Sequence, residues 1–290
     1  MKARDTLENY LFILPAVAIF SVFYIMPFFR VFWYGLNDWD GIMPVMTFVG
    51  LGNFKEIFTD KVWWQSVGHA GYITLIALTL QNAVAFMLAW ACDRQIRARN
   101  FYRLIFFIPP VLSEVVVGLV WQWILDGNYG LLNHWLHGLG LSGLARSWLS
   151  DPQTALTTVA VVHCWKGFGW GFLIFLVGLQ TIPRELYEAA RVDGAGAWQT
   201  FKNVTVPMLL PVIALVVILT ILGTMQIFAL IYTMTQGGPG YHTEVPVTRI
   251  LSSMRASSRF GYACAQGVVF GAILIAVSFM QYRFSRKARM

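Results

Sequence analysis

Long apolar runs separated by shorter polar stretches dominate the 290-residue chain. Six of these runs reach the roughly 20 residues that a helix needs to cross the apolar core of a bilayer. They occupy 10–36, 67–91, 102–125, 155–180, 208–232 and 263–282. Because lipid offers no hydrogen-bond partners to an open backbone, each run is predicted to be helical. The pattern therefore predicts an all-α membrane protein with six transmembrane helices in a single transmembrane domain over 1–290.

The stretches between the runs are predicted to be loops or turns, and two runs contain residues that disturb a helix. Pro27 is expected to kink the first run, while Pro109, Pro110 and Glu114 interrupt the third. A cleaved signal peptide is the competing interpretation of the first run. That run is too long for one, and no small-residue cleavage site follows it, so a membrane helix is favoured. The predicted loops and turns are 37–66, 93–100, 126–154, 181–207 and 233–262.

The composition fits a protein surrounded by membrane lipid. The chain is 57% hydrophobic and 12% charged, whereas an ordinary soluble domain is roughly 25% charged. The net charge of +7 would suit a nucleic-acid partner, but the basic residues are spread between the apolar runs, so no nucleic-acid binding is predicted. Cys92, Cys164 and Cys264 lie in or beside apolar runs and are expected to be packing residues.

The distribution of Lys and Arg predicts the orientation in the membrane. With six crossings, both termini lie on one side, together with 93–100 and 181–207. That side carries 13 of the 21 basic residues, and the opposite side carries six. Because the side richer in Lys and Arg is usually cytoplasmic, both termini and the 181–207 loop are predicted to be cytoplasmic.

The 181–207 loop is a long polar interruption between the strongly apolar runs of the second half. Pro183 suits the start of a short helix, where a missing N–H costs little. Asp193-Gly194 suits its end, because Gly tolerates the left-handed conformation. Apolar residues then recur at helical spacing up to Pro207. The loop is therefore predicted to be a short helix, a glycine break, a second short helix and a proline stop.

Two motifs in the second half resemble those of a known family. Glu188-Ala189-Ala190, three residues, Gly194, nine residues and Val204-Thr205-Val206-Pro207 resemble the EAA loop of the membrane subunits of bacterial ATP-binding-cassette (ABC) importers, with Val in place of Ile and Leu. Thr235-Gln236-Gly237-Gly238-Pro239, followed by Phe260-Gly261-Tyr262-Ala263, resembles the maltose-type sugar permeases. The resemblance implies the type I importer permease fold. It also implies that the ATPase-coupling residues are Glu188, Ala189, Ala190, Asp193, Gly194 and Pro207.

The resemblance further implies a permease subunit of the bacterial cytoplasmic (inner) membrane, which imports a carbohydrate delivered by an extracytoplasmic binding protein. The implied partners are a second homologous permease, two ATPase subunits and that binding protein. The chain has no G-x-x-x-x-G-K-[ST] sequence, so it has no P-loop of its own. No cofactor and no catalytic residue are expected in this chain, and ATP and Mg are expected on the partner ATPase.

In relatives, the sugar is met at mid-membrane by the helices before and after the EAA loop. Carried over by position, the implied contacts are His163, Lys166, Gly167, Trp170, Thr224 and Gln226. A Trp ring suits the C–H face of a sugar, while Thr, Gln and His suit its hydroxyls. An ammonium at Lys166 would favour an anionic sugar; the alternative is that Lys166 only pairs with a neighbouring helix.

Several alternatives compete with the sugar importer. A glycerol-phosphate or polyol importer would share the same motifs. An ion-gradient-driven transporter usually shows internal repeats and intramembrane acids, and only Glu114 is such an acid. A hydrolase or scaffold lacks a nucleophile–base pair. His134 and His137 have no evident third ligand, so no metal site is predicted. Gly167, Gly169 and Gly171 are better explained by close helix packing than by nucleotide binding.

Overall fold

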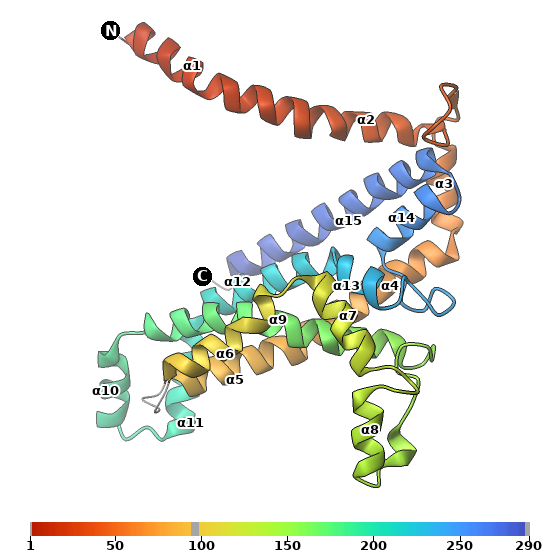
Figure 1. Cartoon of the computed structure of the whole chain (residues 1–290). Coiled ribbons are helices and arrows are strands. Elements are labelled where there is room, and N and C mark those ends of the chain that lie inside the picture. The colour runs from red at the N-terminus through yellow and green to blue at the C-terminus, as the bar shows by residue number, and fades with distance from the viewer. Residues whose placement is uncertain (1, 94–98, 288–290) are drawn as a thin grey trace. The chain divides into compact units, whose positions relative to one another are not determined.

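The computed structural model describes the backbone of residues 2–93 and 99–287, and Figure 1 shows it to be built almost entirely of helices. The basic turn predicted at 93–100 lies largely outside the described residues. The chain, predicted to be one transmembrane domain, divides into two compact units. Unit 1 comprises 1–61 and 250–273, and unit 2 comprises 62–249 and 274–290.

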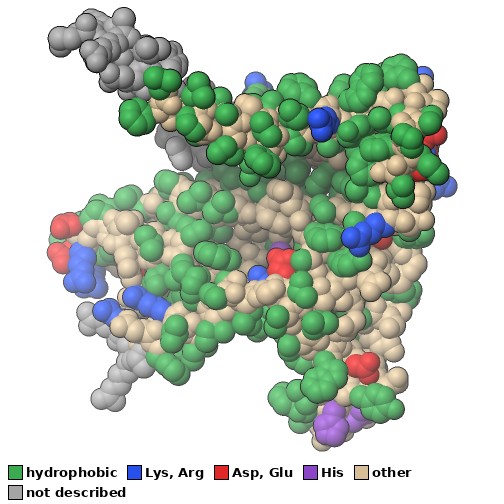
Figure 2. Space-filling model, turned by 45° about the horizontal axis from the view of Figure 1, so that its top comes forward, with side chains coloured by type: hydrophobic (Ala, Val, Ile, Leu, Met, Phe, Trp, Pro, Cys, Tyr) green, Lys and Arg blue, Asp and Glu red, His purple; other side chains and the backbone are tan. Residues whose placement is uncertain are grey.

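Unit 1 begins with a long apolar helix. Its parts are α1 (Lys2–Phe20), the π-helical η1 (Ser21–Ile25) and α2 (Met26–Gly35). The wide π turn ends at Ile25, close before Pro27, whose missing N–H disturbs regular hydrogen bonding. Nearly all side chains from Leu11 to Trp33 are exposed. Figure 2 shows apolar side chains over much of the visible surface, as a membrane-facing protein requires.

The remainder of unit 1 is small elements that follow this helix. A two-stranded antiparallel pair joins β1 (Asn37–Asp38) to β2 (Thr47–Phe48), and α3 (Gly52–Thr59) follows. The start of α15 (Phe260–Lys287) also belongs to this unit. There the backbone N–H of Gly261 donates to the carbonyl of Trp39 at 2.9 Å, and the ring of Phe260 lies 5.0 Å from that of Trp39.

Unit 2 contains the longer helices, and α9 (Ala155–Gln180) lies at its centre. The fully or nearly buried core around α9 is built by Ala85, Ala89, Cys92, Phe172, Phe175, Leu176, Leu179, Ile182, Leu209 and Val216. The other elements of this unit are α4 (Lys61–Ile76), η2 (Ala77–Gln81), α5 (Asn82–Asp93), α6 (Arg99–Val111), α7 (Glu114–Ile124), α8 (Leu131–Gly138), η3 (Ser142–Leu144), α10 (Arg184–Val192), α11 (Ala197–Thr200), η4 (Phe201–Thr205), α12 (Val206–Met225), α13 (Ala229–Met234) and the start of α14 (Pro246–Arg255), whose remainder belongs to unit 1.

The glycines of α9 allow its neighbours to approach closely. A Cβ added at Gly167 would lie 2.5 Å from the side-chain oxygen of Gln81. At Gly169 it would collide with the carbonyl of Phe106 and lie 2.5 Å from a ring carbon of Pro110. The close packing predicted for this glycine series is therefore confirmed, because no larger residue would fit without moving α6 or η2.

Among the described residues, five helices are long and apolar enough to cross a membrane, and α6 with α7 makes a sixth if the pair is one crossing. The two halves of that pair are bent by 95° at Leu112–Ser113. The break follows Pro109 and Pro110, where the sequence predicted an interruption.

The fifth predicted span needs correction at both ends. The helix runs from Ala197 to Met225 without a break, so Pro207 lies within it and is not a stop. The π turn η4 shifts the hydrogen-bond register just before the proline, which lets the helix pass the missing N–H. At the other end the helix stops at Met225, before the predicted limit of 232, and α13 is a separate short helix.

The long stretches predicted as loops contain short helices. These are α3 in 37–66, α8 in 126–154 and α14 in 233–262. Each is too short to show a transmembrane pattern, and polar residues on either side obscure the helical spacing of its apolar positions.

Candidate functional site

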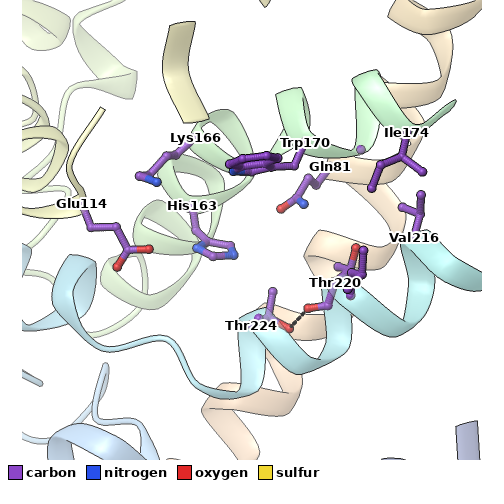
Figure 3. Close-up of a pocket in the computed structure, with 13 residues that line it drawn as sticks. Gln81, Glu114, His163, Lys166, Trp170, Ile174, Val216, Thr220 and Thr224 are labelled. Atoms are coloured by element: carbon purple, nitrogen blue, oxygen red, sulfur yellow. Dashed lines mark hydrogen bonds between the residues drawn. The ribbon is translucent and has the colours of Figure 1, made fainter. Parts of the chain in front are cut away.

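A pocket of about 290 Å³ opens in unit 2 among η2, α7, α9 and α12 (Figure 3). Its wall mixes apolar, neutral polar and charged side chains. The residues labelled in Figure 3 are Gln81, Glu114, His163, Lys166, Trp170, Ile174, Val216, Thr220 and Thr224. A concave site with a few convergent polar groups in an apolar wall is typical of a small-molecule site.

The α9 wall brings together four of the residues predicted to contact substrate: His163, Lys166, Gly167 and Trp170 all line the pocket. Residues three and four apart share one face of a helix, which is why their spacing produces a single wall. Trp170 is 56% exposed, and its ring meets that of Phe107 edge to face at 5.4 Å. The indole therefore presents an apolar surface at the pocket and is held from α6.

The α12 wall is tied to α4 and α5 by hydroxyl groups. The hydroxyl oxygens of Thr74 and Thr224 lie 2.8 Å apart. The Thr224 hydroxyl also donates to the carbonyl of Thr220 at 2.8 Å, and the Thr220 hydroxyl donates to the Asn82 side chain at 3.1 Å. This network holds the wall to which Thr224 was predicted to belong.

Gln226 is not among the residues that line the pocket. It follows the last residue of α12, and its side-chain amide donates to the carbonyl of Leu222 at 3.1 Å. The structure therefore brings five of the six predicted contacts together and leaves Gln226 apart, because the helix ends just before it.

Three buried polar atoms in and beside the pocket wall have no hydrogen-bond partner within the described chain. They are the side-chain oxygen of Gln81, the side-chain nitrogen of Asn82 and Nδ1 of His163. A buried polar group without a partner costs roughly 1–3 kcal/mol, so such groups are uncommon. Gln81 and His163 line the pocket, and both side chains are of a kind that hydrogen-bonds hydroxyl groups.

Sequence reasoning missed part of this wall. Gln81, Glu114 and Thr220 line the pocket but were not predicted as contacts. Thr220 lies four residues before Thr224, one helical turn away, so helical periodicity could have found it. Gln81 and Glu114 stood out only as polar residues within apolar runs.

Comparison with known proteins identifies the class of the chain. Residues 81–290 match the family described as "Binding-protein-dependent transport system inner membrane component". The chain belongs to this family. The permease is also 36% identical to the "Probable ABC transporter permease protein YurN" of Bacillus subtilis, over 100% of this chain and 99% of that one. It is 32% identical to the "Diacetylchitobiose uptake system permease protein NgcF" of Streptomyces coelicolor, over 93% of this chain and 80% of that one.

The fold of the permease is similar to that of a solved bacterial ABC transporter. The two chains superpose with a TM-score of 0.84 at 21% identity, covering 98% of this chain and 96% of the other. That transporter is described as importing the acidic polysaccharide alginate. The likeness confirms the predicted all-α fold of a type I importer permease. The family confirms the prediction of a multi-pass inner-membrane permease of a binding-protein-dependent ABC importer, and this family is a transport component, not an enzyme.

The predicted coupling residues of the permease lie on and around α10. Pro183 precedes the helix, and Gly194 follows it with φ +74°. The N–H of Gly194 donates to Arg191 at 3.1 Å, and that of Ala195 donates to Ala190 at 2.9 Å. These two bonds form the helix-ending motif that Asp193-Gly194 predicted.

The α10 segment is open to its surroundings. Glu188, Ala189, Asp193 and Gly194 are exposed, and Ala190 is half-buried. Pro207, also exposed, lies in the continuous helix that follows. The Tyr187 hydroxyl lies 3.3 Å from that of Thr205, which links α10 to η4. The segment is thus a short exposed helix fixed at its ends.

Proposed function

We propose that this permease carries a carbohydrate across the cytoplasmic membrane and that the pocket of Figure 3 is where it meets the cargo. The observation that carries the proposal is the pocket wall, which places an exposed indole beside buried polar atoms without partners. Sugars have both an apolar C–H face and hydroxyl groups, so such a wall matches both halves of their surface.

Relatives with a named cargo support this proposal. Besides the diacetylchitobiose permease, they include the "Multiple sugar-binding transport system permease protein MsmF" of Streptococcus mutans, 31% identical over 99% of this chain and 99% of that one. By analogy with the family, the cargo arrives on an extracytoplasmic binding protein. A second permease would complete the pore, and two ATPase subunits would hold ATP and Mg.

Import by the reconstituted transporter with Trp170→Ala tests the pocket. The variant should assemble normally, because Trp170 is largely exposed, but carbohydrate uptake should fall about tenfold or more through loss of ring contact. Trp123→Ala is the matched control, since Trp123 is 85% exposed and does not line the pocket. Normal import of the cognate sugar by assembled Trp170→Ala would place the cargo elsewhere.

A second candidate cargo is a glycerol phosphate. The "sn-glycerol-3-phosphate transport system permease protein UgpA" of Brucella abortus is 31% identical over 96% of this chain and 94% of that one. The ammonium of Lys166 on the pocket wall is the observation that favours it. The two candidates are distinguished by comparing the uptake rates of labelled glycerol 3-phosphate and of a labelled oligosaccharide by the same reconstituted transporter.

We also propose that α10 contacts the ATPase on the cytoplasmic side. Its support is the EAA spacing, the exposure of α10 and the excess of basic residues on that side. A short helix fixed by Pro183 and Gly194 can enter a groove of a partner as one piece. Both termini are then cytoplasmic as well.

A cysteine at Val192 tests the side and the partner together. Val192 is 87% exposed, so Val192→Cys in a variant without native cysteines should react with a membrane-impermeant thiol reagent only in inside-out vesicles. The assembled ATPase should slow that reaction about tenfold or more by covering α10. Tyr129→Cys, at a position 94% exposed, should react only from outside, and its reaction rate should not change when the ATPase is assembled. Labelling of Val192→Cys from outside would show that the predicted membrane orientation is wrong.

A further inference from the structure

Two opposite charges share the pocket wall. The residues that line it include one acidic residue, Glu114, and one lysine, Lys166, and both are half-buried. Glu114 is the first residue of α7, whereas Lys166 comes from the middle of α9. In Figure 3 both point into the pocket, with His163 beside them, and Ile174 and Val216 lie farther along the wall. The pocket thus has a charged part and an uncharged part.

Glu114 stands at the start of a helix. It lies in the first turn of α7, immediately after the break at Leu112–Ser113. The N-terminus of a helix carries partial positive charge, which stabilises a carboxylate there. Ionisable residues within membrane segments usually face a water-filled cavity and are placed near opposite charges, because an isolated charge is costly. Glu114 and Lys166 line the same pocket.

We propose that Glu114 offsets the charge of Lys166, so that the pocket is electrically near neutral and selects uncharged saccharides over anionic ones. This inference rests on the proposed carbohydrate function and narrows its cargo. Glu114 would be the specificity-determining residue, because its carboxylate repels a uronate or a phosphate that Lys166 alone would attract. Recognition then depends on neutral groups, the side-chain oxygen of Gln81 and Nδ1 of His163, which lack partners within the described chain.

The size of the effect makes it measurable. At roughly 10 Å and an effective dielectric constant of about 20, one unit charge changes the local concentration of a monovalent ion by about tenfold. Removal of either charge should therefore change how fast charged reagents reach the pocket. Removal of both should restore the original balance, whereas a purely structural role of either residue would not produce this reciprocity.

The test uses a thiol in the pocket of the complete importer. Ile174→Cys is made without Cys92, Cys164 and Cys264, and its reaction is timed with two methanethiosulfonates, one bearing a trimethylammonium and one a sulfonate. The ratio of the two rates is normalised to that of Tyr129→Cys, which is exposed outside the pocket. Added Lys55→Gln serves as the control charge change, because Lys55 is exposed and belongs to unit 1.

The normalised ratio should stay within about threefold of unity in the Ile174→Cys protein and with Lys55→Gln. Glu114→Gln should shift it about tenfold towards the sulfonate, and Lys166→Gln about tenfold towards the ammonium reagent. The Glu114→Gln/Lys166→Gln double variant should return to within threefold of unity. Glucose should slow the reaction in the starting protein more than glucuronate does, and Glu114→Gln should reverse that order.

Three results would overturn the inference. One is a tenfold preference for the sulfonate reagent in the protein that has both Glu114 and Lys166. Another is a ratio of the two reaction rates that does not change with Glu114→Gln. The third is a failure of both reagents to react with a cysteine at Ile174 and also with a cysteine at Gly223, a second residue that lines the pocket. The proposed function fails separately: normal import by Trp170→Ala would reject the pocket as the cargo site even if the charges balance.

Discussion

The buried side chain of Asn53 in unit 1 and those of Gln81 and His163 in the pocket of unit 2 differ in their hydrogen bonding. In unit 1, the Asn53 amide donates to the carbonyls of Gly35 and Asn37 at 3.0 and 2.9 Å. The Tyr262 hydroxyl donates to Asp60 at 2.8 Å. In the pocket wall, buried atoms of Gln81 and His163 have no partner within the described chain.

The difference separates two uses of polarity. A satisfied buried group fixes backbone segments relative to one another, and its loss leaves carbonyls unpaired. An unsatisfied group at a cavity costs stability and is retained where a ligand completes it. The comparison therefore predicts that substitution of Asn53 lowers stability, whereas substitution of Gln81 lowers transport.

The largest expected effect on stability is that of Asn53→Ala. The change removes the donor of two buried hydrogen bonds, so the free energy of unfolding should fall by about 2–4 kcal/mol. Thermal unfolding of the purified permease measures this. Asn128→Ala, at an exposed position, is the control and should change little. Equal stability of the two variants would contradict the claim that the Asn53 hydrogen bonds stabilise unit 1.

Gln81→Met should show the opposite behaviour. Methionine is close in size and removes an amide oxygen without a partner, so stability should stay the same or rise slightly. Carbohydrate import should fall about threefold to tenfold, the value of one neutral hydrogen bond to cargo. Uptake and unfolding are measured on the same preparation. A destabilised variant with full import would show that Gln81 serves the fold.

The smallest effect is expected at the Glu56–Arg259 ion pair of unit 1, whose two N···O distances are 2.6 and 2.5 Å. The guanidinium of Arg259 lowers the pKa of Glu56 below its usual 4.5. The pair therefore adds stability that is present above pH 4.5 and is lost as pH falls through the lowered pKa of Glu56.

Because both side chains are more than a third exposed, the pair should contribute no more than about 1 kcal/mol. The melting-temperature difference between wild type and Glu56→Gln should shrink as pH is lowered from 7 towards 3. Arg259→Gln added to Glu56→Gln should lower the melting temperature little further at pH 7. A difference that is constant with pH would argue against the ionic contribution.

Much of the fold could be predicted from local sequence. The apolar run at 155–180 has the same bounds as α9, because its ends are marked by abrupt changes of polarity. Asp193-Gly194 ends α10 as predicted, since the left-handed conformation of Gly is a local property. Pro207 misled the prediction because the π turn before it depends on the hydrogen bonding of the whole helix.

The candidate site was only half visible in the sequence. His163, Lys166 and Trp170 were implied by the family resemblance, and their helical spacing explains why they share one wall. Gln81 does not, because its place opposite Gly167 is a contact between segments more than 80 residues apart. Gln226 lies outside the pocket wall because α12 ends at Met225, within an apolar run where composition gives no boundary.

The unbroken helix from Ala197 to Met225 has a mechanical consequence. Its 29 residues, at about 1.5 Å each, make a rod roughly 43 Å long. One end carries the stacked rings of Trp198 and Phe201, and the other carries Thr220 and Thr224 of the pocket wall. A stiff rod passes a twist or a push at one end to the other almost undiminished. The π turn is the single place along this helix where the winding differs. A twist applied at one end would therefore change the helix most at this turn.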